Sequence, residues 1–347
     1  MLHPFTCTQL GEFRKFKQHG HGSHTKADGS RYVGAWAKGK RDGIGVEWDA
    51  LGKVKYDGYF VKDKRHGCGI LTSPDGYQYA GEWCSDMRSG CGVETFADGR
   101  RYEGENLEGK MHGRGRLEWP GGTQYDGEWH NGNRHGIGIN LYAGGGCYEG
   151  EWSEGQKHGK GTYTWADGRQ YQGEWCDDEE HGHGIYVWAN GDRYEGEYRD
   201  GNRHGKCRYT DCDGSMYQGE WFQGIERGQG TSTHSDGSRY EGQTFQGKWH
   251  GHGIHTAPDG YTYDGAWQVG KRHGKGKEEW NDPVKRIEGV FVMDKRQGHG
   301  SETCHSEYHF VGEWKRGAKD GEGVKKWVDG RSYHGQFKCD ESRPVRV

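Results

Sequence analysis

The sequence has few aliphatic residues and no long apolar run. Hydrophobic residues make up 30 % of the 347 positions, where roughly 45–50 % is usual when glycine is counted with them. No stretch reaches the roughly 18 apolar residues of a membrane-spanning helix, so we expect none. Residues 1–10 show no basic patch followed by an apolar stretch, which argues against a signal peptide. Only 6 prolines interrupt the chain, so strands can form almost throughout.

The chain also lacks a strong charge of one sign. It has 48 basic and 52 acidic residues and a formal net charge of −4. This balance gives no electrostatic reason to bind nucleic acid, and we expect no nucleic-acid partner. The 10 cysteines, without a secretory signal, indicate free thiols in a reducing compartment and predict a cytoplasmic protein.

The chain is instead rich in glycine and in large aromatic residues. The chain holds 66 Gly, 15 Trp and 21 Tyr. Glycine follows no three-residue period, which excludes collagen, and the aromatic content argues against disorder. A chain of this length suggests two domains, but it has too few aliphatic residues for two ordinary cores.

A fixed period runs through the chain. From Tyr56 to Tyr263, tyrosine recurs every 23 residues, nine times without a slip. We take this tyrosine as position 0 and name each repeat by it. Two further steps are 24 residues long. The series continues at both ends with Gln9, Tyr32, Ile287, Phe310 and Tyr333. The period therefore predicts fifteen repeats over residues 9–337, the last one truncated.

Glycine and aromatic residues keep fixed places within each repeat. Gly stands at +2 in all fifteen repeats and at +11 in all fourteen complete ones. Position +4 is aromatic in thirteen repeats, position +13 is Gly in thirteen, and position +10 is His in nine. Residues 148–170, YEGEWSEGQKHGKGTYTWADGRQ, form a typical repeat that ends near an Asp-Gly turn.

This pattern predicts one β-hairpin per repeat. Tyr-x-Gly-x-Trp and Gly-x-Gly-x-Tyr-x-Trp both alternate with period two, so Tyr and Trp share one face of a strand. Asp-Gly and Asn-Gly favour tight turns. Gly at +2 indicates that an aromatic ring lies across it. Because one hairpin cannot bury its face alone, we expect an all-β, elongated, single-sheet solenoid of stacked hairpins, about 10 Å per repeat.

Breaks in the pattern define the remaining boundaries. We expect tails at residues 1–8 and 338–347, and irregular segments at 49–55 and 280–310. Within the second segment, residues 282–310, which include Pro283, are interpreted as a bend or a partner-binding segment. Asn106 and Thr244 replace the +4 aromatic residue, and a one-residue bulge would bring the following Leu107 or Phe245 into its place.

Charge is organised in rows. Acidic residues at +1 or +3, such as Glu103 and Glu151, are expected on the face opposite Tyr and Trp. Lysine or arginine stands at +8 or +9 in twelve of the fourteen complete repeats, which we place in the hairpin loop as a basic edge. One interpretation is solvation of an exposed sheet, and the other is binding of anions or acidic partners. The candidate residues are Lys40, Arg41, Lys64, Arg65, Lys271, Arg272, Lys295 and Arg296.

No catalytic or cofactor motif is found. A ribbon of equal repeats offers rows of side chains rather than unlike groups converging in one pocket, so we expect no enzyme and no cofactor. Two clusters contain zinc-ligand types, although His is also a residue of the repeat pattern, so no metal site is expected. These clusters are Cys176 with His181 and His183, and His204 with Cys207 and Cys212.

The repeat Y-x-G-x-W-x-x-G-K-x-H-G-x-G resembles the MORN repeat. Here it is carried by the segments Tyr148-Glu-Gly150-Glu-Trp152, Gly155, His158-Gly159 and Gly161, and it covers about 95 % of the chain. A chain made almost only of such repeats is similar to the cytoskeletal MORN proteins of protists and to those of ciliary radial spokes. That resemblance implies a non-enzymatic scaffold, often a homodimer joined through its terminal repeats.

Two functions are therefore expected as alternatives. The first is a rigid scaffold of the cytoskeleton, cilium or flagellum, including the axoneme or basal body, that organises protein partners. The second is a membrane-associated module that binds anionic phospholipids along the basic edge. The net charge of −4 favours the scaffold.

Overall fold

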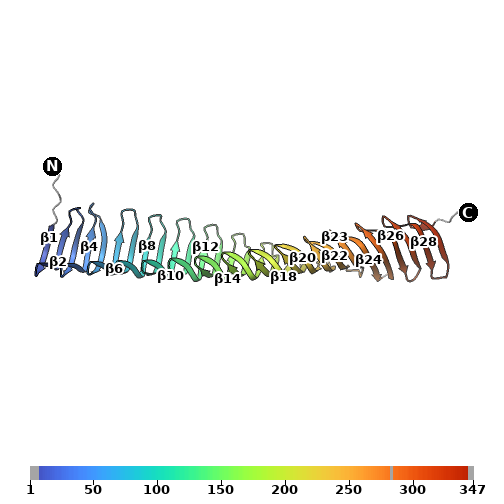
Figure 1. Cartoon of the computed structure of the whole chain (residues 1–347), viewed down its shortest axis with the longest axis horizontal. Helices are drawn as coiled ribbons and strands as arrows, with labels where there is room; N and C mark the ends of the chain where they lie inside the picture. The colour runs from blue at the N-terminus through green and yellow to red at the C-terminus, as the bar shows by residue number, and fades with distance from the viewer. Residues whose placement is uncertain (1–7, 282–283, 343–347) are drawn as a thin grey trace, which may run out of the picture. The chain divides into compact units, whose positions relative to one another are not determined.

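The repeats fold as consecutive antiparallel hairpins. A computed structural model describes residues 8–281 and 284–342, in which thirty strands and no helix occur. In Figure 1 the strands of each part lie side by side in chain order. Their bounds are β1 Thr8–Arg14, β2 Lys17–Thr25, β3 Arg31–Ala37, β4 Lys40–Trp48, β5 Val54–Val61, β6 Lys64–Thr72, β7 Gln78–Cys84, β8 Met87–Thr95, β9 Arg101–Leu107, β10 Lys110–Glu118, β11 Gln124–His130, β12 Asn133–Leu141, β13 Cys147–Ser153, β14 Gln156–Thr164, β15 Gln170–Cys176, β16 Glu179–Val187, β17 Arg193–Arg199, β18 Asn202–Thr210, β19 Met216–Phe222, β20 Ile225–Thr233, β21 Arg239–Phe245, β22 Lys248–Thr256, β23 Thr262–Gln268, β24 Lys271–Asn281, β25 Val284–Val292, β26 Lys295–Cys304, β27 Tyr308–Lys315, β28 Ala318–Trp327, β29 Ser332–Lys338 and β30 Glu341–Ser342.

The chain divides into two units. Unit 1 comprises residues 1–168 and 174–178, and unit 2 comprises residues 169–173 and 179–347. Within the described part of unit 1, each strand from β1 to β14 pairs with the next one in the chain. Within unit 2 the same holds from β16 to β30. The all-β hairpin fold expected from the period is confirmed.

Two kinds of turn alternate along each unit. Positions +6 and +7 form a two-residue turn within a repeat, as at Lys62 and Asp63, whose φ angles are 49° and 74°. Successive repeats are joined by the Asp-Gly turn. There Gly76 has φ 95°, and the N–H of Ser73 donates to the carbonyl of Tyr77 at 2.8 Å. Both turns place residues in the left-handed region, which Gly, Asn and Asp tolerate best.

The core is a ladder of aromatic rings on one face of the sheet, which we call the core face. Tyr79 is completely buried and meets Trp83 edge to face, with ring centroids 5.1 Å apart. Trp83 also meets Tyr56 of the preceding repeat, at 5.7 Å. Its indole N–H donates to the carbonyl of Gly69 in that repeat, at 3.1 Å. Each +4 ring therefore packs within its own repeat and against its neighbour.

Glycine is required where a tyrosine ring crosses the sheet. The hydroxyl of Tyr79 donates to the carbonyl of Glu82 at 3.0 Å. A Cβ atom on Gly81 would lie 2.6 Å from the Tyr79 hydroxyl oxygen and 2.6 Å from the Cα of Gly92. Burial raises the pKa of Tyr79 to about 12, so its hydroxyl keeps its proton at neutral pH. The expected ring over the +2 glycine is thus present. Because aromatic rings form the core, the chain needs few aliphatic residues to build it.

The two repeats without an aromatic residue at +4 differ from the expectation. The bulge expected at Asn106 and Thr244 is wrong, because both remain buried in the ordinary register, whereas Leu107 and Phe245 are 48 % and 42 % exposed. Without an added residue in these repeats, the alternation of the strand keeps the following side chain on the opposite face.

The longer repeats are accommodated locally. The extra residue near 49–55 produces a register shift between Glu47 and Trp48. Pro283 lies outside the described residues, and pairing includes Asn281 with Val284 on either side of it. Residues 341–342, expected in a tail, pair with β29.

Candidate functional site

The hairpin loop is shorter than the sequence analysis assumed. Because the turn holds only positions +6 and +7, positions +8 and +9 begin the second strand. Position +9 pairs directly with +4, as Arg88 does with Trp83. Paired residues across two antiparallel strands point to the same face. The +8 side chain is therefore exposed, while the +9 side chain lies on the core face.

The +9 cations link neighbouring repeats. The guanidinium carbon of Arg65 lies 4.2 Å from the Trp83 ring centroid in the next repeat. Its Nε donates to the Asp86 carboxylate at 3.1 Å, and Nη2 donates to the Asp86 carbonyl at 3.3 Å. Lys157 occupies the equivalent place over Trp175, with Nζ 3.9 Å from the centroid. Further examples are Arg41 over Phe60, Arg134 over Trp152, Arg203 over Trp221 and Arg296 over Trp314.

The eight candidate basic residues therefore divide into two sets, which corrects the single basic edge placed in the loop. The lysines at +8 are exposed: Lys40, Lys64, Lys271 and Lys295. The arginines at +9 have side chains only 24–27 % exposed and are held by aromatic rings and carboxylates: Arg41, Arg65, Arg272 and Arg296. Cation–π contact and burial of the aliphatic stem make these arginines part of the packing.

Buried carboxylates at +15 are a feature that sequence reasoning missed. Glu94 is 1 % exposed, forms an ion pair with Arg88 and accepts a hydrogen bond from the Tyr77 hydroxyl at 2.7 Å. In unit 2, Glu302 is 2 % exposed and contacts Lys285, Arg296, Lys319 and Tyr308. Glu278 has the same arrangement with Arg272 and Tyr261. These carboxylates complete the packing of the +9 cations.

The opposite face, which we call the outward face, carries positions +1, +3, +12 and +14. Its acidic row is confirmed, since Glu103 and Glu151 are exposed there. The +3 carboxylates also have a local role. Glu151 accepts a hydrogen bond from the backbone N–H of Lys160 at 2.9 Å and lies over Gly159, whose φ is 56°. The invariant +11 glycine thus meets both a backbone and a steric requirement.

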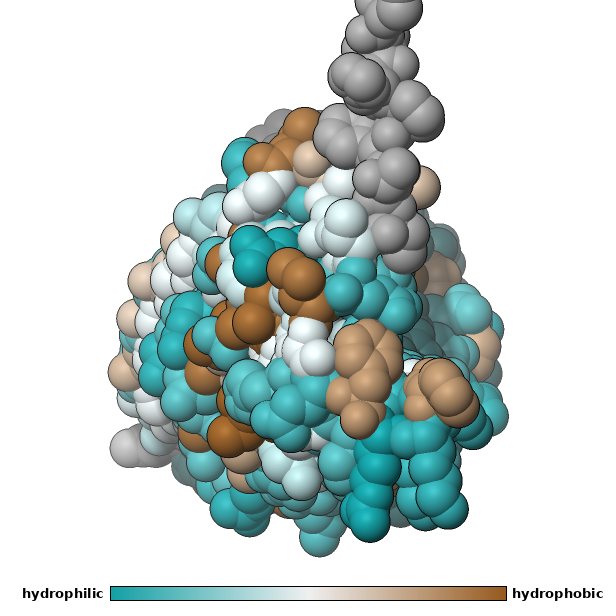
Figure 2. Space-filling view, turned by 90° about the vertical axis from the view of Figure 1, so that its left-hand side faces the viewer, coloured by the Kyte–Doolittle hydropathy of each residue, from teal (hydrophilic) through white to brown (hydrophobic). Residues whose placement is uncertain are grey.

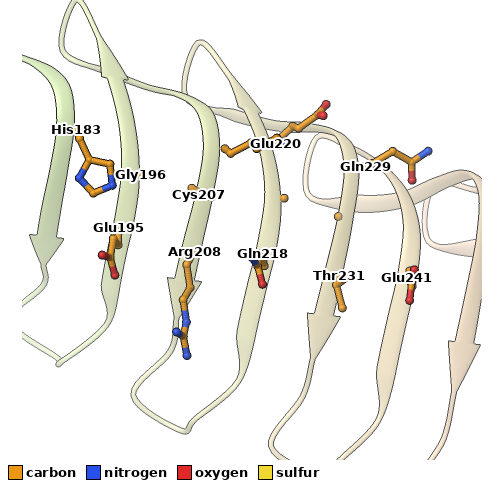
Figure 3. A pocket seen from close by; sticks show the side chains of 13 residues that line it. His183, Glu195, Gly196, Cys207, Arg208, Gln218, Glu220, Gln229, Thr231 and Glu241 are labelled. Carbon is orange, nitrogen blue, oxygen red and sulfur yellow. The ribbon is translucent and has the colours of Figure 1, made fainter.

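A polar hollow crosses the outward face of unit 2 (Figure 3). The side chains in it come from equivalent positions of successive repeats. Arg193 donates to Glu195 at 2.7 Å and holds the pKa of that carboxyl below its usual range, so Glu195 is ionised at neutral pH. The lining side chains at +1 are Glu195, Gln218 and Glu241, those at +12 are His183, Lys206 and Gln229, and those at +14 are Arg208 and Thr231.

Neither of the two clusters that contain zinc-ligand types is brought together as one group among the described residues. Among the described residues, the one group of three potential metal ligands joins Cys176 with His158 and Asp177 rather than with His181 and His183. His181 and His183 lie in β16 of unit 2. Cys207 of the second cluster is buried on the core face, where burial raises its pKa to about 12.

None of the described residues forms a helix that is long and apolar enough to cross a bilayer. All nine cysteines in the described segments are free.

Comparison with known proteins identifies the repeat. The profile of the MORN repeat matches fourteen segments, at residues 11–31, 32–50, 56–76, 79–100, 102–124, 125–147, 148–168, 171–193, 194–216, 217–239, 240–260, 263–282, 288–306 and 310–330. No curated protein sequence was found to match the chain significantly.

Two solved structures show a limited likeness. One is the TCP domain of SAS-4 from Drosophila melanogaster in complex with a proline-rich motif of Ana2. It is 12 % identical, with 51 % of this chain and 90 % of that chain covered and a TM-score of 0.29. The other is the G-box domain of the microcephaly protein CPAP, 10 % identical over 65 % of this chain and 100 % of that chain, with a TM-score of 0.24. Such low scores carry no functional argument.

MORN repeats generally mediate contacts with other proteins or with membranes. The fourteen matched segments together span most of the sequence, and the chain belongs to the MORN-repeat family.

Proposed function

We propose that the chain is a non-enzymatic cytoplasmic scaffold of the cytoskeleton, cilium or flagellum, whose outward face holds protein partners in register. The polar hollow of unit 2 carries this proposal. Its side chains occupy the same few positions from one hairpin to the next, so a partner meets polar and charged groups at regular intervals. Many weak contacts of this kind act together when one partner spans several repeats.

The same regularity argues against catalysis. A reaction needs unlike groups that converge on one reacting atom. In the hollow, Glu195 and Glu241 are equivalent residues two repeats apart, and Lys206 has an equivalent in Gln229. The carboxylates of Glu195 and Glu241 fit an extended partner segment with basic side chains spaced about 20 Å apart, which is the span of two hairpins or of roughly six extended residues.

Binding of anionic phospholipid remains the alternative, and the exposed +8 lysines are the residues that support it. Lys40, Lys64, Lys271 and Lys295 are exposed and begin equivalent strands. The arginines beside them are occupied by packing, which halves the basic edge expected from the sequence.

Homodimerisation through terminal repeats is a further part of the proposal. Every residue of β1 is exposed, and Leu10, Phe13 and Phe16 are 69 %, 52 % and 104 % exposed. Figure 2 views this end, where apolar residues lie among polar ones. Exposed apolar side chains on an end strand favour association. A light-scattering mass near 39.3 kDa at micromolar concentration would contradict the dimer.

Detergent extraction of cells that express the tagged chain, followed by fractionation, tests the scaffold. We expect the protein to stay with the insoluble cytoskeleton after detergent extraction at physiological salt. Complete release by detergent would contradict the scaffold. In that case, salt-sensitive binding to anionic vesicles that is lost on changing Lys40 and Lys64 to Ala would establish the lipid alternative.

A further inference from the structure

We propose that His158, Cys176 and Asp177 form a binding site for a zinc-like divalent transition-metal ion in unit 1. His158 lies in β14, Cys176 ends β15, and Asp177 begins the turn that follows. Each offers one ligand atom, and the three atoms lie within 4.8 Å of one another. The site is separate from the outward-face hollow and from the aromatic core.

The repeat geometry brings these side chains together. Position +5 of one repeat lies beside position +10 of the preceding repeat. The rings of His112 and His130 show this with centroids 5.1 Å apart, and those of His204 and Phe222 show it at 5.3 Å. Cys176 and His158 occupy the same pair of positions. Asp177 follows at +6 with a φ of 50°, and it supplies the third ligand.

The three groups match the ligand preference of zinc. Thiolate, imidazole and carboxylate all bind Zn²⁺ at roughly 2.0–2.3 Å, and a thiolate with an imidazole selects zinc over magnesium or calcium. None of the three side chains has a hydrogen-bond or ion-pair partner in the described part of the chain, so they can close around an ion. His158 and Asp177 are exposed and Cys176 is half-buried, which leaves a fourth position for water.

The nearby cation does not compete for the site. Lys157 precedes His158, but its ammonium lies 3.9 Å from the Trp175 ring centroid on the core face. In the chain after Asp177, Asp178 is followed by Glu179 and Glu180 at +8 and +9, where twelve of the fourteen complete repeats carry at least one basic residue. A divalent cation therefore enters a locally acidic part of the sequence.

The chain contains its own control. His66 and Cys84 occupy the same +10 and +5 positions, but the next residue is Ser85, so the carboxylate is missing. In the described residues, only the group at His158 brings three ligand types within reach of one ion.

A titration of the full, reduced chain with Co²⁺ tests the site, because a cobalt–thiolate bond gives a characteristic near-ultraviolet absorption band. We expect the band to reach its full intensity at one equivalent of Co²⁺ and to disappear when Zn²⁺ displaces the bound cobalt. Cys176→Ser should remove the band, and His158→Ala or Asp177→Asn should weaken cobalt binding at least about tenfold. Asparagine is chosen because it tolerates the left-handed turn.

Cys84→Ser and His66→Ala serve as matched controls and should bind cobalt like the parent chain. Circular dichroism and thermal unfolding would establish that each variant is folded. The proposal is overturned if the parent gives no thiolate band at one equivalent, if the band survives Cys176→Ser, or if either other site variant binds as tightly as the parent. The outcome does not depend on the scaffold function.

Discussion

Arg65 and Trp83 belong to neighbouring repeats, and the guanidinium of Arg65 lies over the indole ring of Trp83 at 4.2 Å from its centroid. The same residue is held at its outer end by the carboxylate and carbonyl of Asp86. Stability in a repeat protein depends on such contacts between neighbours. Half of the candidate basic residues, the arginines at +9, therefore hold neighbouring repeats together and are not free to bind anions.

Changing Arg65 to Ala should lower the free energy of unfolding by about 1–2 kcal/mol, because a partly desolvated cation–π contact and its packing are lost. Urea unfolding followed by tryptophan fluorescence measures this loss. Lys64→Ala removes an exposed charge one residue away and should change stability by less than about 0.5 kcal/mol. Equal effects of the two substitutions would show that Arg65 is not a structural link.

Gly81→Ala should be destabilising because the added methyl group meets the Tyr79 hydroxyl and the Gly92 backbone, each at 2.6 Å. We expect a loss of about 1–3 kcal/mol, as for other overpacked cores. Gly121→Ala is the control, since no atom lies within 4 Å of its added Cβ. Thermal unfolding of the two variants should separate them clearly, and a neutral Gly81→Ala would refute the packing described for the tyrosine ring.

Glu302→Gln should destabilise unit 2 at neutral pH by about 3 kcal/mol, because it leaves the buried Lys319 ammonium without the carboxylate that pairs with it. Burial alone would raise the pKa of Glu302, but the Tyr308 hydroxyl, Lys319 and Lys285 outweigh it and hold that pKa below 4.5. A depressed pKa contributes stability that is present above the unfolded-state pKa and lost as pH falls through the folded-state value.

The difference between Glu302→Gln and the parent should therefore shrink below about pH 4. Urea midpoints measured across an acid pH series provide the check. A difference that stays constant across that series would mean that the charge of Glu302 is not what stabilises the site.

Glu226→Gln should have the opposite effect. Glu226 stands at +9, where most repeats carry a cation, and burial raises its pKa although Arg203 partly opposes this. A raised pKa means that stability is full below the unfolded-state value and falls as pH rises through the folded-state value. Glu226→Gln should stabilise the chain at neutral pH and have no effect in acid. Destabilisation at neutral pH would contradict this assignment.

The repeated sequence allowed most of the fold to be predicted, because position 0, the +2 and +13 glycines and the +4 ring form one local packing unit. Period-two alternation placed Tyr79 and Trp83 on one face correctly. The two-residue turn could also have been recognised from the sequence. A polar residue at +6 is commonly followed by Gly or Asp at +7, as in Glu154-Gly155. That turn would have placed Lys157 opposite Trp152 rather than in a loop.

Other features needed the three-dimensional pairing. The burial of Glu94 depends on Tyr77 and Arg88, neither of which is adjacent to it in the sequence. Likewise, Cys176 meets the histidine 18 residues before it, because neighbouring repeats rather than neighbouring residues determine the contact. Sequence spacing instead favoured His181 and His183, which are closer along the chain.

The fraction of the protein that resists detergent extraction, measured for the parent and for a Glu195→Lys, Glu241→Lys double variant, tests the central claim most directly. Both carboxylates lie on the outward face, and their ion pairs with Arg193 and Arg239 are exposed and contribute little to stability. The account predicts that the parent stays with the insoluble cytoskeleton, while the folded double variant is released. A double variant retained as fully as the parent, or a parent that is wholly released, would contradict it.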